Sequence, residues 1–264
     1  MPHVGALYRY PVKGFTPEAC DFLWILPNGR VAGDRVIGIR FANTDAPDDC
    51  WSRKTGMLAL VNTPGLARLR LRIDTTKLQL CIEHNGATLV DARLDDEGRK
   101  AIGGAVARHV LGLEENPLRG HPERLPLRVV GDGVTPRYHD SEAGQVTLHG
   151  RGSLRALAAA LGKVEVNELR FRSNIAIDGL SAWEEQGWVG RKIRIGTVEF
   201  DVTRPKLRCL ATHANPQTGQ RDLPVLTTLT TAFNQQKPTF AVAMVPVNGP
   251  GEIRVGDEVM VSEG

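Results

Sequence analysis

Short runs of alternating apolar and polar residues constrain the fold of this sequence more than any other feature. In the N-terminal part they cover residues 4–10, 22–26, 35–41, 69–73 and 77–83. A period of two residues is typical of strands that bury one face, and turn-forming residues separate the runs. Asn85-Gly86 follows the last of these runs and predicts a tight hairpin turn.

Two segments show the helical period instead. Between residues 95 and 113, one helical face collects Ile102, Ala105, Val106, His109, Val110 and Leu113. The second helix is expected to have Ser153 as its N-cap and to stop at Gly162. Further strands are expected at residues 163–178, 192–202, 240–247 and 252–261. Because strands predominate and do not alternate regularly with helices, we expect a β-rich α+β fold with barrel-like or sandwiched sheets.

Composition limits the partners and the compartment. A net charge of +3 over 264 residues is small, whereas nucleic-acid and membrane binders concentrate far more positive charge. The first residues lack the uninterrupted apolar stretch of a secretory or membrane-spanning segment. We therefore expect a cytoplasmic protein without a nucleic-acid or membrane partner. Reduced cysteines fit that compartment best, although the count of four leaves paired disulfides open.

One cysteine lies in an unusually basic segment. Arg204, Lys206 and Arg208 precede Cys209 within five positions, whereas Cys20, Cys50 and Cys81 are scattered and form no CxxC pair. Nearby positive charge favours a thiolate, which is both a nucleophile and a soft metal ligand. The same cations could neutralise a phosphate on a bound ligand. A strand with solvated basic side chains and a buried cysteine fits this local sequence as well.

Other basic residues are candidates for the same site. Lys13 lies between Pro11 and Gly14 where a strand would end, and Arg35 follows Gly33-Asp34. If residues 163–178 form a strand, Arg170, Arg172 and Asn174 lie on one of its faces. Each of these features also fits a solvated surface. His139, His149 and His213 have no metal-ligand spacing and are assigned no role.

Taken in order, these segments resemble the MOSC family, which is named after the C-terminal domain of molybdenum-cofactor sulfurase. The resemblance rests on YPVKG, GDR, WSR, FRSNIAIDG, RCLATHANPQTGQRD and IRVGDEV. It is closest to the two-part branch that includes the mitochondrial amidoxime-reducing component and its bacterial relatives. It implies an N-terminal β-barrel-type region at residues 1–118, a MOSC domain at residues 119–264, and a basic join at 117–128.

The resemblance also implies a cofactor and its contacts. Cys209 matches the family's molybdenum ligand and is the expected catalytic and metal-binding residue. The cofactor would be the molybdenum cofactor, a molybdenum–molybdopterin; pyridoxal phosphate binding is a further family-level expectation. The residues expected to contact or surround the molybdenum cofactor are Lys13, Gly14, Arg35, Arg172, Asn174, Arg208, Thr212 and Asp222.

Three segments depart from the family pattern. Relatives usually have a small hydroxyl residue at the position of Gly14, and they commonly read Cys-Ser where Lys206-Leu207 stands here. The stretch before the second helix, usually rich in threonine or serine, contains Gly150-Arg151-Gly152. These changes lie where the pocket wall is expected, so they bear on the substrate and on the details of cofactor contact.

The resemblance implies an oxidoreductase that reduces small N-oxygenated compounds. Because no flavin, haem or iron–sulfur motif is visible, the electrons would come from a separate redox protein. Two alternatives stay open. Cys209 could carry a persulfide in a sulfurtransferase, or the domain could bind the cofactor without catalysis.

Overall fold

The computed structural model describes residues 1–162 and 164–262. Its strands are β1 (His3–Arg9), β2 (Glu18–Cys20), β3 (Phe22–Ile25), β4 (Gly38–Arg40), β5 (Leu69–Asp74), β6 (Gln79–His84), β7 (Ala87–Arg93), β8 (Arg128–Val130), β9 (Val146–Gly150), β10 (Ile175–Asp178), β11 (Lys192–Ile195), β12 (Val198–Leu207), β13 (Thr239–Pro246), β14 (Gly251–Arg254) and β15 (Val259–Val261). The α-helices are α1 (Asp96–Leu111), α2 (Arg151–Ala160) and α3 (Val225–Ala232). Short 3-10 helices include η2 (Pro64–Arg68), η4 (Glu168–Phe171) and η6 (Leu210–His213).

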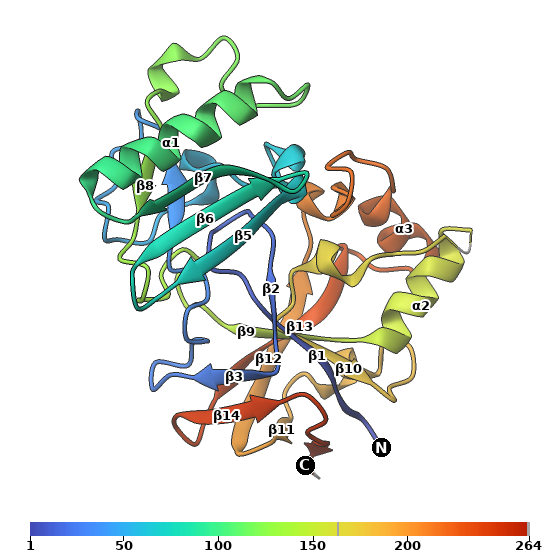
Figure 1. The fold of residues 1–264 in the computed structure, drawn as a ribbon. Coiled ribbons are helices and arrows are strands. Elements are labelled where there is room, and N and C mark those ends of the chain that lie inside the picture. Colours follow the sequence, from blue (N-terminus) through green and yellow to red (C-terminus); the bar gives the residue numbers. More distant parts are fainter. Residues whose placement is uncertain (163, 263–264) are drawn as a thin grey trace.

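A large mixed sheet organises the molecule (Figure 1). Its strand order within the described residues is β15-β11-β12-β13-β9-β10-β1-β2. A smaller antiparallel sheet, β5-β6-β7, lies beside α1 at the other end of the molecule. The expectation of a β-rich α+β fold is confirmed.

N-terminal strands pair with strands that lie far away in the sequence. β1 pairs antiparallel with β10, β3 pairs with β14, and β4 pairs with β8. The segment between β1 and β4 contains Lys13 and Arg35, and it brings them close to Cys209, which follows the end of β12. The predicted division at residue 118 stays a prediction.

The two largest apolar cores of the described residues support these sheets. One packs α1 against the small sheet through residues such as Ile102, Val106 and Leu80. The other fills one side of the large sheet with residues such as Phe200 and Ile177. Burying such side chains is the main stabilising contribution to a fold of this kind.

The hairpin and the first helix form as the sequence predicts. Asn85 and Gly86 both have positive φ, 52° and 78°, as the tight turn between β6 and β7 requires. The helix α1 begins after Asp95, whose side chain accepts a hydrogen bond from the Gly98 amide at 2.9 Å.

The predicted start of the second helix was wrong. α2 begins at Arg151 with Gly150 as its N-cap, so Ser153 lies inside the helix. The buried Ser153 hydroxyl donates to Glu185 at 2.8 Å and accepts from the Trp183 amide at 2.8 Å. Its hydrogen-bonding capacity is used by a neighbouring segment, which leaves none for capping.

The strand predicted at residues 163–178 was also wrong for most of its length. Lys163 lies outside the described residues, and only β10 is a strand. The Asn167 side chain accepts from the Leu169 amide at 3.0 Å and starts the 3-10 helix η4. Arg172 then adopts a left-handed conformation, with φ 53° and ψ 35°. The alternation of a strand therefore does not determine the directions of the Arg170, Arg172 and Asn174 side chains.

Among the residues described, no helix is both long and apolar enough to cross a membrane.

Candidate functional site

Cys209 lies two residues after the end of β12 and is the N-cap residue of η6, where it lines two adjoining cavities. Both cavities are also lined by Arg35, Asp140, Arg172 and Ala211. We call the two cavities together the Cys209 pocket. Lys13 and Gly14 line the inner cavity. The outer cavity adds His139, Ser141, Gln145, Thr147, Arg170, Phe171, Lys206, Leu207, Arg208 and Thr212. Cys209 is half-buried, so the pocket gives access to this residue.

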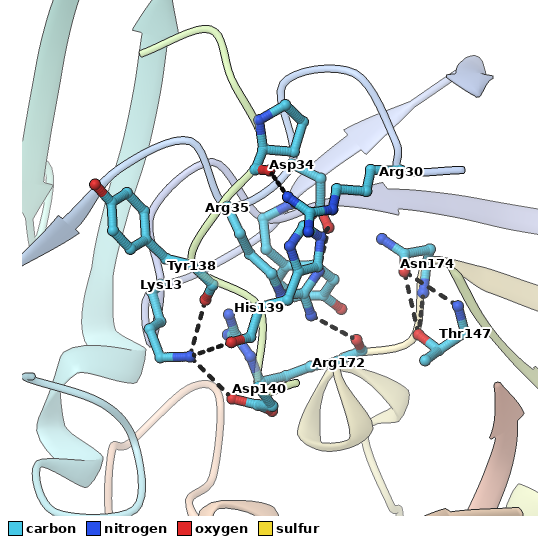
Figure 2. A network of polar contacts seen from close by, with 12 residues as sticks. Lys13, Arg30, Asp34, Arg35, Tyr138, His139, Asp140, Thr147, Arg172 and Asn174 are labelled. Carbon is cyan, nitrogen blue, oxygen red and sulfur yellow. Dashed lines mark hydrogen bonds and ion pairs between the residues drawn. The ribbon is translucent and has the colours of Figure 1, made fainter. Parts of the chain in front are cut away.

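Lys13 connects the N-terminal segment to the pocket wall (Figure 2). Its Nζ donates to the carbonyl oxygens of Tyr138 and His139 at 2.8 and 3.1 Å, and to Asp140 Oδ1 at 3.1 Å. Burial lowers the pKa of Lys13, and the negative charge of Asp140 opposes that shift. Lys13 therefore holds residues 138–140 at the edge of the inner cavity.

Two arginines of the pocket have left-handed backbones. Arg35 and Arg172 have φ values of 54° and 53°, which is uncommon for residues other than glycine and concentrates at functional sites. Arg35 pairs with Asp34. The guanidinium of Arg172 lies over the Tyr10 ring at 4.3 Å and donates to the Phe15 carbonyl. Burial and the neighbouring Arg35 charge lower the pKa of Arg172 to about 10.

Lys206 in β12 and Arg208 directly after this strand are two further cations of the pocket. Arg208 donates to the Phe171 carbonyl, while its buried Nε has no hydrogen-bond partner in the described structure. Burial lowers the pKa of Arg208. Lys206 is also largely surrounded by protein, and burial lowers its pKa to about 8.

The pocket therefore carries an excess of positive charge. Arg35 pairs with Asp34, and Lys13 pairs with Asp140. Arg172, Lys206 and Arg208 have no carboxylate within 4 Å among residues 1–162 and 164–262. Because buried cations are normally paired, these three favour an anionic ligand in the pocket.

Asp140 is the carboxylate closest to these cations. Desolvation opposes its ionisation, but the positive charges of Lys13, Arg35 and Lys206 hold its pKa below the usual range. It stays negatively charged at neutral pH and offsets part of the excess. No motif in the sequence marked Asp140, because its role depends on contacts with residues more than sixty positions away.

Thr212 fixes the backbone around Cys209. Its amide and its hydroxyl both donate to the Cys209 carbonyl oxygen at 3.0 Å. These bonds close the first turn of η6 and set the direction in which the chain leaves the cysteine. The predicted place of Thr212 in the loop around Cys209 agrees with this geometry.

Asn174 and Asp222 are not among the residues that line the two cavities, and their predicted contacts with the cofactor stay a prediction. Asn174 is buried; it donates to the Tyr8 carbonyl and accepts from Thr147, which joins β1 to β9. Asp222 accepts two hydrogen bonds from Arg170, at 2.7 and 2.9 Å. Arg170 in turn donates to the His213 carbonyl at 2.9 Å. Asn174 therefore joins strands next to the pocket, and Asp222 holds Arg170 against the loop that follows Cys209.

Arg221, which the sequence did not single out, joins three parts of the molecule. It donates to Glu115 at 2.6 Å, to the Val61 carbonyl at 2.9 Å and to the Leu210 carbonyl at 2.8 Å. Val61 lines the inner cavity, and Leu210 follows Cys209. Arg221 therefore holds the N-terminal wall of the pocket against the cysteine loop.

A comparison with protein families identifies the domain that contains Cys209. The family model described as "MOSC domain" matches residues 135–260. The chain carries a MOSC domain. The match includes the cysteine segment and β9 to β14, whereas Lys13 and Arg35 reach the Cys209 pocket from outside the matched residues.

Curated proteins similar to this chain are molybdenum cofactor sulfurases. The human protein is 35% identical over 96 residues, which cover 35% of this chain and 10% of that protein. The Caenorhabditis elegans protein is 34% identical over 87 residues, covering 32% of this chain and 12% of that protein. The alignment spans about a tenth of the length of these relatives.

Solved structures show only a distant likeness. The YuaD protein from Bacillus subtilis has a TM-score of 0.43 at 10% identity, with 99% of this chain and 96% of that chain covered. YiiM from Geobacillus stearothermophilus has a TM-score of 0.34 at 16% identity, with 45% and 54% covered.

Proposed function

We propose that the Cys209 pocket binds a molybdenum–pterin cofactor and that the protein reduces N-oxygenated compounds with it. The observation that carries this proposal is the excess of positive charge around an accessible cysteine in a MOSC domain. The similarity of this chain to molybdenum cofactor sulfurases supports the choice of cofactor.

The residues of the pocket fit such a group. A cysteine sulfur is a soft ligand that suits molybdenum, and guanidinium groups bind phosphate with directed hydrogen bonds. Arg172 and Arg208 lack carboxylate partners in the described residues, and the buried Nε of Arg208 lacks any partner. A phosphorylated pterin would supply the missing negative charge and acceptors. Cys209 would hold the metal, and Arg35, Arg172 and Arg208 would hold the anionic part.

When bound, the cofactor would supply two-electron redox chemistry at the metal. Reducing an amidoxime to an amidine consumes two electrons and two protons, breaks the N–O bond and releases water. The electrons would come from a separate redox protein, and the protons from solvent. Within the chain, Thr212 fixes the Cys209 carbonyl, and Lys13 keeps Asp140 at the pocket wall.

An activity assay with a cysteine series tests the proposal. The purified protein would be supplied with chemically reduced methyl viologen and benzamidoxime, and amidine formation measured. We expect Cys209→Ala to abolish reduction, while Cys20→Ala, Cys50→Ala and Cys81→Ala retain it. Equal loss in all four variants, or no reduction by the wild type with its cofactor present, would refute the proposal.

The similarity to sulfurases also supports a second candidate function, that of a sulfurtransferase. Cys209 would take sulfane sulfur from a donor persulfide, which leaves as a thiol, and pass it on. A persulfide mass on Cys209 in protein without molybdenum would favour this function.

A third candidate is a non-catalytic cofactor-binding module, which the Lys206-Leu207 segment suggests. Such a protein would bind the cofactor but reduce no N-oxygenated compound. Pyridoxal phosphate binding stays a prediction.

A further inference from the structure

The outer cavity contains a cation that the cofactor contacts do not require. Lys206 lines the outer cavity with Ser141 and Gln145 but does not line the inner cavity, where Lys13 lies. Lys206 forms no ion pair within 4 Å in the described part of the chain, and Asp140, the carboxylate nearest to it, is bonded to Lys13. Lys206 is therefore available to a second anion.

The backbone of β12 is irregular at Lys206. Pro205 pairs with Val242 on β13, whereas Leu207 pairs with Thr239, so the register shifts between Pro205 and Leu207. Such irregularities occur next to functional sites, where they redirect side chains. In this chain the irregularity coincides with a lysine that faces the pocket. Lys206-Leu207 is also a segment in which the sequence departs from the MOSC pattern.

A second cation lies beside Lys206. The Nη2 of Arg204 donates to Gln145 Oε1 at 2.7 Å, and Gln145 Nε2 donates to Thr203 Oγ1 at 2.8 Å. Gln145, which lines the outer cavity, thus connects the Arg204 guanidinium to the cavity wall. Arg204 is exposed and does not itself line the cavity, but it also lacks a carboxylate within 4 Å among the described residues and adds positive charge next to Lys206.

We propose that Lys206 forms an anion subsite in the outer cavity, with the exposed Arg204 beside it, so that the compounds reduced by this protein carry a carboxylate or a phosphate besides the N–O group. This inference rests on the proposed reductase function. The cavity places the subsite next to Cys209, where one small molecule can reach both. A neutral substrate would leave the largely buried Lys206 without a counter-charge.

A pair of matched ligands tests the subsite by binding, independently of turnover. Isothermal titration calorimetry would compare 4-carboxybenzamidoxime with the neutral benzamidoxime on the protein as purified. We expect the anionic compound to bind about tenfold more tightly, since a charge-assisted hydrogen bond contributes that order of affinity. Lys206→Gln should remove this preference, and raising the salt concentration should reduce it.

Lys100→Gln is the control, because Lys100 is an exposed lysine on α1, outside the Cys209 pocket. It should keep the full preference. Equal affinity of the two compounds for the wild type, or an unchanged preference in Lys206→Gln, would overturn the subsite. Reduction of benzamidoxime is measured in parallel. A binding preference that depends on Lys206, without reduction of either compound, would uphold the subsite and refute the reductase function.

Discussion

Replacing Gly14 by serine, the kind of residue that relatives carry there, should destabilise this protein. Gly14 has a φ of 81°, and a Cβ atom at this position would lie 2.5 Å from Ala59 Cα and 2.9 Å from the Leu58 carbonyl oxygen. The left-handed conformation costs a non-glycine residue roughly 1–2 kcal/mol. Crowding against backbone adds about 1–3 kcal/mol. We therefore expect Gly14→Ser to lower the free energy of unfolding by about 2–5 kcal/mol.

Gly86→Ser separates the two contributions. Gly86 has a similar φ of 78°, but nothing lies within 4 Å of a Cβ atom there. This variant should lose only the conformational part, roughly 1–2 kcal/mol. Urea unfolding followed by circular dichroism would measure both variants. If Gly14→Ser loses no more stability than Gly86→Ser, the close approach of Gly14 to Ala59 is not a constraint and the reasoning fails.

Three other perturbations test the pocket and its supports. Arg172→Ala should lower cofactor occupancy, measured as bound pterin, far more than the unfolding free energy; an unfolded variant would show that Arg172 is structural. Asp222→Ala leaves the buried Arg170 guanidinium without its carboxylate and should cost about 2–4 kcal/mol in urea unfolding; an unchanged midpoint would contradict that role. Burial lowers the pKa of His139, against the opposing effect of Asp34, so the unfolded state binds its proton more readily. Stability should therefore fall as the pH drops below about 6.5, and His139→Gln should flatten this dependence; an equal slope in the variant would refute it.

Local patterns predicted the elements whose stability comes from their own residues. The hairpin at Asn85-Gly86 formed where the turn chemistry indicated, and the helix at residues 96–111 formed where the helical period of apolar residues indicated. The start of α2 could not be predicted, because a buried contact with Glu185 uses the Ser153 hydroxyl. The same holds for Arg172, whose left-handed backbone is imposed by its surroundings.

The candidate site shows the same division. Lys13, Arg35 and Arg172 meet at Cys209, and only the resemblance to MOSC proteins, not residue spacing, linked these distant positions. Asn174 and Asp222 belong to the same sequence motifs as pocket residues, but their side chains bind Tyr8 and Arg170. Asp140 and Arg221 escaped prediction, because their importance comes from long-range hydrogen bonds that leave no local pattern in the sequence.

The most direct test of the central claim is the molybdenum and pterin content of the purified protein. Protein from a molybdenum-replete host should contain close to one molybdenum atom and one pterin per chain, by metal analysis and by fluorescence of the oxidised pterin. Cys209→Ala should lose most of the metal while staying folded. Wild-type protein that contains neither molybdenum nor pterin under these conditions would contradict the account.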